Sequence, residues 1–287
     1  MNRFASGPKR SYYGKGDVIV YRLHRQGNQP AGQSPVFGAS VKMLLYGDAF
    51  WRTYTTGDNS GLIATDSMKN FIQRETMNFG GGDLESYCLF LGEKFLGIYP
   101  QTEGVQVSAS EIPYHGVSEK QVSFAPARPE RAYARVELAR EGSSLKTVEA
   151  VSGIDGFRLL RLGGSSFCGF VHDQYTTLPD VKNRPLHMWL DLEWSYTDTA
   201  HAFNAGEATA RVRRVVLETF DGFESGSIQQ IIYQVGTRVL AELPTVGSVH
   251  LEANNRTWDT IIEHGDAVGV YTDARPPYGC LALTLSR

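Results

Sequence analysis

Residues 186–196 read LHMWLDLEWSY, and apolar side chains occupy every second position of this stretch. Alternation with a period of two predicts a β-strand that buries one face and exposes the other. Two helical patterns follow. The apolar face of the first consists of Val212, Val215, Val216 and Phe220. The second has Ser227 as its N-cap, and its apolar face consists of Ile228, Ile231, Ile232, Val235 and Val239. The pattern indicates two helices that pack on a sheet.

Further strand patterns flank this central block. Before it, alternation and bulky side chains predict strands at 156–162 and 167–171, and after it at 246–253 and 281–285. The second half of the chain is therefore expected to consist of strands, two helices and strands, in that order.

The first half of the chain follows the same order. Its predicted elements are strands at 17–23 and at 36–56 with a turn at 46–48, a helix after the capping run 65–67, a helix with Leu84, Cys88, Leu91, Phe95 and Ile98 on one face, and strands at 105–109 and 132–138. The repeat predicts two domains, 12–142 and 143–287. Segregated strands with paired helices indicate an α+β fold, in which two helices cover one face of each antiparallel sheet. Open sheets have free edges, and a ring of subunits would close them.

Composition and charge exclude several classes of function. The 287 residues include 28 Lys and Arg against 31 Asp and Glu, which gives a net charge of -3 and argues against nucleic-acid or anionic-membrane binding. No apolar run approaches the roughly 20 residues that cross a bilayer. Cys88, Cys168 and Cys280 form no disulfide or zinc spacing, and the first ten residues lack an apolar signal core, so we expect a cytoplasmic protein. Neither the seven histidines nor the glycines form a metal or phosphate motif, so the sequence offers no positive sign of a metal site, although distant residues could still assemble one.

Two segments of the first half carry residues suited to proton transfer. Lys15 stands between two glycines before a strand and would act as a base if its pKa fell well below about 10.4; otherwise it is a solvated lysine in a turn. Thr65 and Asp66 precede a helix, where free N–H groups favour an anion and a hydroxyl can relay a proton. The alternative for this pair is ordinary helix capping.

Two segments of the second half carry residues suited to a flat anion. Phe167 and Arg184 offer a stacking ring and a two-pronged guanidinium, although aromatics in strands more often belong to a core and loop arginines to the surface. Gln229 at a helix start and Asn254 after a strand offer amides that could read the edges of a ligand. Their alternatives are a solvated glutamine and a turn asparagine.

Together these segments resemble the cofactor-independent urate oxidase (uricase) family. The similarity rests on Tyr13-Gly14-Lys15, on Asp58-Asn59-Ser60 with Ala64-Thr65-Asp66-Ser67-x-Lys69-Asn70, on the spacing from Phe167 through Tyr175-Thr176-Thr177-Leu178 to Arg184, and on Ser227-Ile228-Gln229, in the family's order over roughly residues 12 to 285. The resemblance implies two tandem tunnelling-fold (T-fold) domains and a homotetramer that encloses a tunnel, with sites between subunits. It also implies conversion of urate, O2 and water to 5-hydroxyisourate and hydrogen peroxide in purine degradation, without metal or other cofactor.

The resemblance further implies a role for each matched residue. In these roles Phe167 stacks on the purine, Arg184 binds one urate edge with two hydrogen bonds, Leu178 lines the pocket, and the Ile228 N–H and the Gln229 amide bind the pyrimidinedione edge. Asn254 holds O2, water or peroxide above the ring. From a neighbouring subunit, Thr65 and the Asp66 backbone contact the five-membered ring, and Lys15 stands behind Thr65 in a proton relay.

One position departs from the family pattern. Arg256 occupies the place where the family's relay has a histidine, and arginine does not release a proton near neutral pH. We hypothesise that Arg256 acts as a fixed charge that lowers the pKa of Lys15 and favours a bound anion. His250 or His264 could instead carry the proton. The departure also keeps open a non-catalytic purine-binding oligomer of the same fold, while a related tunnelling-fold purine or pterin enzyme would need a histidine cluster.

Overall fold

The computed structural model describes residues 11–25, 30, 33–120, 122–204, 207–265 and 268–287. The chain divides into two compact units. The first comprises Met1–Gly153 and Ser195–Gly206, and the second comprises Ile154–Trp194 and Glu207–Arg287. The domain limits 12–142 and 143–287 stay a prediction.

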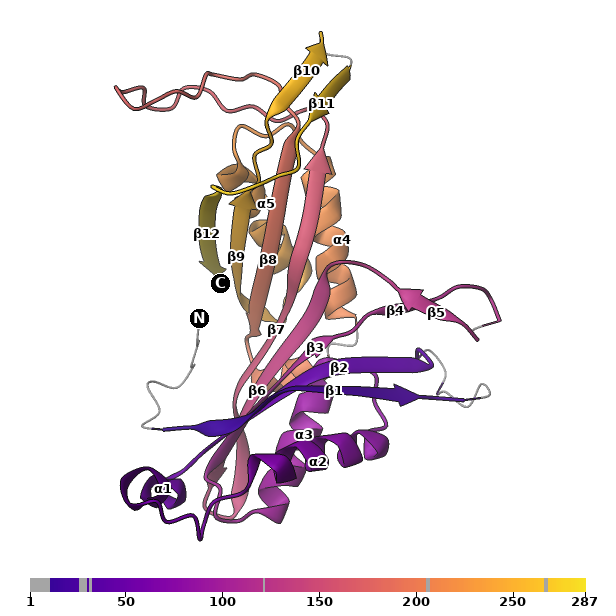
Figure 1. Cartoon of the computed structure of the whole chain (residues 1–287), viewed down its shortest axis with the longest axis vertical. Coiled ribbons are helices and arrows are strands. Elements are labelled where there is room, and N and C mark those ends of the chain that lie inside the picture. Colours follow the sequence, from indigo (N-terminus) through magenta and orange to yellow (C-terminus); the bar gives the residue numbers. More distant parts are fainter. Residues whose placement is uncertain (1–10, 26–29, 31–32, 121, 205–206, 266–267) are drawn as a thin grey trace. The chain divides into compact units, whose positions relative to one another are not determined.

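An antiparallel sheet with helices on one face forms the first unit (Figure 1). In spatial order its strands are β1 (Tyr13–Leu23), β2 (Val36–Tyr46), β3 (Gly104–Glu111), β6 (Arg131–Glu141) and β7 (Ser144–Arg161), the last of which runs on into the second unit. Its helices are α1 (Trp51–Thr56), α2 (Thr65–Glu75) and α3 (Leu84–Ile98), with short 3-10 helices at Asp48–Phe50, Thr76–Asn78 and Thr199–Asn204; β4 (Tyr114–Gly116) and β5 (Phe124–Pro126) form a separate hairpin. Helix α2 contacts β1, and α3 contacts β3 and β6.

The core of the first unit lies between this sheet and its helices. Leu84, Cys88, Leu91 and Phe95 of α3 are buried, as their spacing predicts, whereas Ile98 at the helix end is 53% exposed. They pack with the inward side chains of the strands, such as Met43 of β2. Burying this face stabilises the helix far more than its intrinsic propensity does.

The second unit has a sheet and two long helices. Its strand order is β7, β8 (Leu186–Tyr196), β9 (Val246–Asn255) and β12 (Gly279–Ser286), with helices α4 (Ala208–Asp221) and α5 (Ile228–Glu242) and a hairpin of β10 (Thr260–His264) and β11 (Val268–Tyr271). Helix α5 packs on β9 and β12 and against α4 (Figure 1). Strand β8 and the buried faces of both helices match the prediction, and the Ser227 Oγ caps α5 by accepting from the Gln230 N–H at 3.2 Å. Both units are α+β, as predicted.

Three local predictions are wrong. The second half of the predicted strand 36–56 is helical, because Phe50 turns into the core and Gly57 closes α1 in a left-handed conformation with φ of 68°. Phe167 makes only an isolated bridge to Val181, so 167–171 is not a strand. Helix α2 begins at Thr65 rather than after the run 65–67, and Ala64 is its N-cap residue without a capping side chain. None of the helices within the described ranges is long and apolar enough to cross a membrane.

Candidate active site

Lys15 lies in a bulge of the edge strand β1. The register between β1 and β2 shifts between Lys15 and Val18, and Asp17 adopts a left-handed φ of 54°. Gly14 is required before it, because a Cβ there would lie 1.9 Å from the Met43 carbonyl oxygen. Bulges redirect side chains at sheet edges. The sequence predicted the glycine-flanked lysine before a strand, and the structure places it inside one.

Thr65 and Asp66 form the first turn of α2. The Asp66 carboxylate accepts hydrogen bonds from Lys69 Nζ at 2.5 Å and Asn70 Nδ2 at 2.8 Å. These bonds, with Lys69 first, hold the pKa of Asp66 below its usual value, and the charge of Lys15 adds a smaller lowering. Lys15 and Asp66 are therefore electrostatic neighbours within the first unit.

Tyr13 connects the strand that carries Lys15 to the start of α2. Its hydroxyl accepts a hydrogen bond from the Ile63 N–H at 3.0 Å, and its ring packs edge-on against Phe50. Burial raises the pKa of Tyr13 to about 12. Tyr13 therefore remains a neutral structural link at neutral pH and does not act as a base.

Phe167 and Arg184 lie together in the second unit. Phe167 exchanges two backbone hydrogen bonds with Val181, at 2.8 and 3.0 Å, and the Arg184 N–H donates to the Ser165 carbonyl at 2.9 Å. The Arg184 guanidinium lies 5.8 Å from the centroid of the Phe167 ring. Its Nε is buried without a hydrogen-bond partner among the described residues, and burial lowers its pKa. A guanidinium nitrogen that has lost water and gained no partner favours an anionic ligand.

The plane of Phe167 is fixed by a second ring. Phe170 stacks on it with a centroid distance of 4.9 Å and an interplanar angle of 14°, and His172 stacks on Phe170 at 4.6 Å. The spacing Phe167-x2-Phe170 is visible in the sequence, but the family resemblance implies a role only for Phe167. Leu178, predicted to line the pocket, is 46% exposed.

The helix α5 begins at the predicted recognition pair. Ile228 is 5% exposed, whereas Gln229 is exposed at the first turn. Ser227 stands before them in an extended conformation, so the free N–H groups of the helix start follow directly. Asn254 is not in a turn: it lies near the end of β9, where it pairs with Cys280 of β12.

Arg256 is clamped between two aromatic rings. Its guanidinium carbon lies 3.9 Å from the Trp189 ring centroid and 4.0 Å from that of Tyr278. Its N–H donates to the His187 carbonyl at 3.0 Å. Cation–π contacts with both rings fix the charge in place.

The surroundings of Arg256 carry further unpaired polar atoms. His187 Nδ1, Trp189 Nε1 and Arg256 Nε are buried without hydrogen-bond partners in the described part of the chain. Burial lowers the pKa of His187, and the charges of Arg158 and Arg256 add to the lowering against an opposing effect of Asp273. His187 and Trp189 share one face of β8 by alternation, which the sequence shows, but their contact with Arg256 was not predicted.

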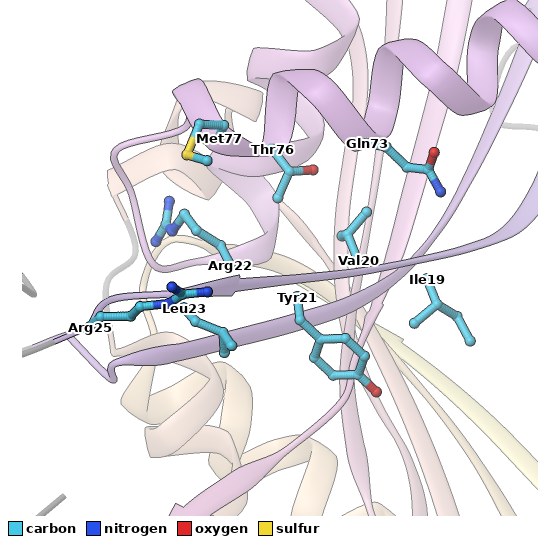
Figure 2. A pocket seen from close by; sticks show the side chains of 9 residues that line it. All are labelled: Ile19, Val20, Tyr21, Arg22, Leu23, Arg25, Gln73, Thr76 and Met77. Carbon is cyan, nitrogen blue, oxygen red and sulfur yellow. The ribbon is translucent and has the colours of Figure 1, made fainter. Parts of the chain in front are cut away.

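Two cavities lie in the described structure near charged residues. One, of about 470 Å³, is lined in the second unit by the loops next to Phe167, Arg184 and the start of α5, including Ser166, Lys182 and Ser225. The other, of about 600 Å³, lies in the first unit along β1 (Figure 2). None of the predicted site residues lines either cavity.

The cavity along β1 is bordered by a guanidinium that already has partners. In Figure 2 Arg22 points to the α2 side of the strand and Tyr21 to the opposite side. Arg22 donates to the carbonyls of Phe79 and Gly81. Its charge is therefore used in holding the chain that leads to α3. Within the described ranges, no three His, Cys, Asp or Glu side chains gather as a metal site would require.

Fold and site together define a class: a tandem α+β protein of the tunnelling-fold type, in which the guanidinium of Arg184 lies beside the stacked ring of Phe167. The family model described as Uricase matches residues 150–281. The uricase of Haloferax volcanii is 35% identical over 303 residues, covering 96% of this chain and 97% of that protein. The chain belongs to the uricase family, as its motifs predicted.

Other relatives agree with this assignment. The crystal structure of a uricase from Bacillus fastidious superposes with a TM-score of 0.89 at 34% identity and covers 97% of this chain and 94% of its own. The uric acid degradation bifunctional protein of Bacillus sp. (strain TB-90) is 35% identical over 301 residues, which is 96% of this chain. The chain spans 60% of the length of that protein and of its Bacillus subtilis counterpart.

Proposed function

We propose that this chain is a urate oxidase, which converts urate, O2 and water to 5-hydroxyisourate and hydrogen peroxide. Family membership supports the reaction. The observation that carries the proposal is the buried, unpartnered Nε of Arg184 beside the stacked ring of Phe167. A planar anion with several N–H and C=O groups along its edges matches a ring face and a guanidinium fork.

The reaction needs a deprotonated substrate and a place for oxygen. Urate that has lost a proton is electron-rich, so it gives two electrons to O2, which becomes peroxide, while water adds to the oxidised ring. Lys15, through Thr65, takes the proton, and Asn254 holds the oxygen species above the ring. Arg184, the Ile228 N–H and Gln229 hold the anion, with Leu178 at the pocket wall. Fixed donors of this kind stabilise developing charge and position the reactants, and no metal or cofactor takes part.

The same proposal includes a homotetramer with sites between subunits. The strand β1 ends the strand order of its sheet, and its outward side chains Ile19, Tyr21 and Leu23 are 49–56% exposed. An apolar edge strand is a ready interface for another chain. Sedimentation equilibrium should give four times the mass of one chain, and a monomer at working concentrations would exclude this part of the proposal.

A cytoplasmic location forms the last part of the functional proposal. It is supported by the three cysteines, which are all free. Disulfides are rare in reducing compartments.

We infer for Arg256 the electrostatic role that its position suggests. A guanidinium held by two rings cannot shuttle protons, but it keeps a positive charge two residues after Asn254 in the sequence. Replacing Arg256 with His should add an ionisation near pH ~6.5 to the pH profile of turnover and reduce the rate at high pH, where the imidazole is neutral. Arg158, the second guanidinium on Trp189, at 4.8 Å, serves as the matched control. If neither the acid limb nor the rate moves, Arg256 plays no part in turnover.

The function itself is tested by one oxygen-electrode experiment. Dialysed protein with a chelator, urate and no added cofactor should consume O2 in step with the loss of the ultraviolet absorbance of urate. The departure at Arg256 favours one competing function, a purine-binding oligomer without catalysis. Urate binding without oxygen uptake would identify that alternative and reject the oxidase.

A further inference from the structure

Arg161 is a buried cation at the end of β7, outside the set of residues matched to the family. It is 9% exposed, and its guanidinium lies 4.8 Å from the Phe220 ring centroid and 5.8 Å from that of Phe223. Its Nη1 donates to the carbonyl oxygens of Gly164, at 3.2 Å, and Phe223, at 2.9 Å. It also reaches the Ser225 Oγ at 3.3 Å. One side chain therefore joins two loop segments that lie about sixty positions apart in the sequence.

The two loop segments are also joined to each other by their backbones. The Ser225 N–H donates to the Gly164 carbonyl at 2.9 Å, and the Ser166 N–H donates to the Ser225 carbonyl at 2.8 Å. The buried hydroxyls of Ser165 and Ser225 lie 3.3 Å apart. Three residues after Ser225 the helix α5 begins with Ile228, and one residue after Ser166 stands Phe167.

A third segment, residues 181–184, is hydrogen-bonded to the segment that contains Ser165 and Phe167. The Arg184 N–H donates to the Ser165 carbonyl, and Phe167 pairs with Val181. The Phe167 ring, the Arg184 guanidinium and the start of α5 thus lie on three segments that are tied together by a few backbone hydrogen bonds. Such contacts are few compared with a strand ladder, and loops held by few contacts open locally at low cost.

We propose that Arg161 is a positioning residue that fixes these three segments in the arrangement that binds urate. The proposal rests on the proposed function. A charged donor forms stronger hydrogen bonds to carbonyls than a neutral group does, and the planar guanidinium lies over the Phe220 ring while it donates in its own plane. Lysine offers no such plane. Small displacements of binding groups have large effects on reactions that depend on their positions.

The test compares Arg161→Met and Arg161→Lys with the native enzyme. We measure kcat and KM for urate in air, and the dissociation constant of urate under nitrogen, where turnover stops. Loss of the Arg161 hydrogen bonds in Arg161→Met should raise KM and the dissociation constant by about 10- to 100-fold, with a smaller effect on kcat. Arg161→Lys should show an intermediate increase.

Arg287 provides a matched control in the same unit. It also donates to backbone carbonyls, those of Leu240, Leu243 and Val246, but at the other end of α5. Arg287→Met should lower the melting temperature and leave KM unchanged. Equal increases of KM in Arg287→Met and Arg161→Met would mean a general loss of stability and would overturn the proposal.

Hydrogen exchange gives a readout that does not depend on catalysis. In Arg161→Met the amides of Ser166, Arg184 and Ser225 should exchange faster, while those inside α4 and α5 should keep their native rates. If Arg161→Met does not fold, Ser225→Ala removes one acceptor and leaves the guanidinium bonded to the Gly164 and Phe223 carbonyls, so it should give the same pattern with a smaller increase in the dissociation constant.

Failure of this inference is distinct from failure of the proposed function. Native protein that does not oxidise urate rejects the function. The hydrogen-exchange rates of the loop amides still report whether Arg161 holds the loop segments together. A folded Arg161→Met variant with native exchange rates and a native dissociation constant for urate rejects the positioning role, whatever the activity of the native enzyme.

Discussion

The candidate proton-transfer residues of the first unit and the candidate anchors of the second unit are built in different ways. Lys15 and Thr65 lie in a strand bulge and in the first turn of a helix, and both are partly exposed to water. Phe167 and Arg184 lie on loops cross-linked by short backbone hydrogen bonds, and the Nε of Arg184 is buried. The difference separates two tasks: a group that exchanges protons benefits from access to water, whereas a group that holds an anion gains strength from its exclusion.

Loss of Lys15 should have the largest effect on the rate. If it is the base, Lys15→Met should lower kcat on the order of 10²- to 10⁴-fold while the anaerobic affinity for urate changes little. Lys42 of the neighbouring strand is the matched control, because its side chain passes next to Gly16. Lys42→Met should keep native kcat. A Lys15→Met enzyme with native turnover would remove this residue from the mechanism and, with it, the division of tasks.

Loss of Arg184, in contrast, should mainly lower the affinity for urate. Arg184→Ala should weaken urate binding by about 2–5 kcal/mol, because a buried charge pair with the substrate is lost. Arg184→Lys keeps the charge without the fork and should recover only part of the affinity. Isothermal titration under nitrogen measures both. Native affinity in the alanine variant would show that the assigned orientation of the ligand is wrong.

Removal of the ring of Phe167 should also weaken urate binding, but by less than the loss of Arg184 does. Phe167→Leu keeps the apolar bulk and the backbone pairing with Val181, so the loss should be about 0.5–1.5 kcal/mol of stacking. Phe170→Leu tests whether the second ring merely supports the first, in which case urate affinity should fall less than in Phe167→Leu. A larger loss in Phe170→Leu would assign the contact with the purine to the other ring.

The fold could be predicted where one face of an element decides its structure. Strand β8 and helices α3 and α5 bury the faces that their periods indicate. The segment after Gly47 could not, because its Thr and aromatic side chains favour strands by propensity, while burial of Phe50 and the left-handed Gly57 determine the helix. Local preference yields to packing between distant segments.

The candidate site could be predicted only in part, for the same reason. Lys15, Thr65 and Arg184 stand in motifs that the sequence displays directly. Arg161 and Trp189 do not, because their contacts arise only when strands and loops from distant parts of the sequence meet. No spacing within the sequence encodes those encounters.

The smallest expected effect is on the pH dependence of stability and comes from a buried carboxyl in the first unit. This carboxyl has no assigned role in binding urate, unlike Phe167 and Arg184. Glu85 of α3 accepts from Ser152 Oγ at 2.5 Å, and that hydroxyl also contacts the Tyr196 hydroxyl at 2.7 Å. Burial raises the pKa of Glu85. The folded state therefore holds this proton to higher pH than the unfolded state, so the stabilisation is complete below pH ~4.5 and is lost as the pH rises through the folded pKa.

Glu85→Gln should remove that pH dependence. The slope of unfolding free energy against pH, up to about 1.4 kcal/mol per pH unit from one group, should flatten above pH ~4.5, as measured by urea denaturation at several pH values. The same substitution at the exposed Glu141 serves as the control. Urate affinity should stay native in both variants, because the anchors belong to the other unit. A change in affinity with Glu85→Gln would show that stability of the first unit and binding in the second are coupled, and the two tasks would then no longer be separable.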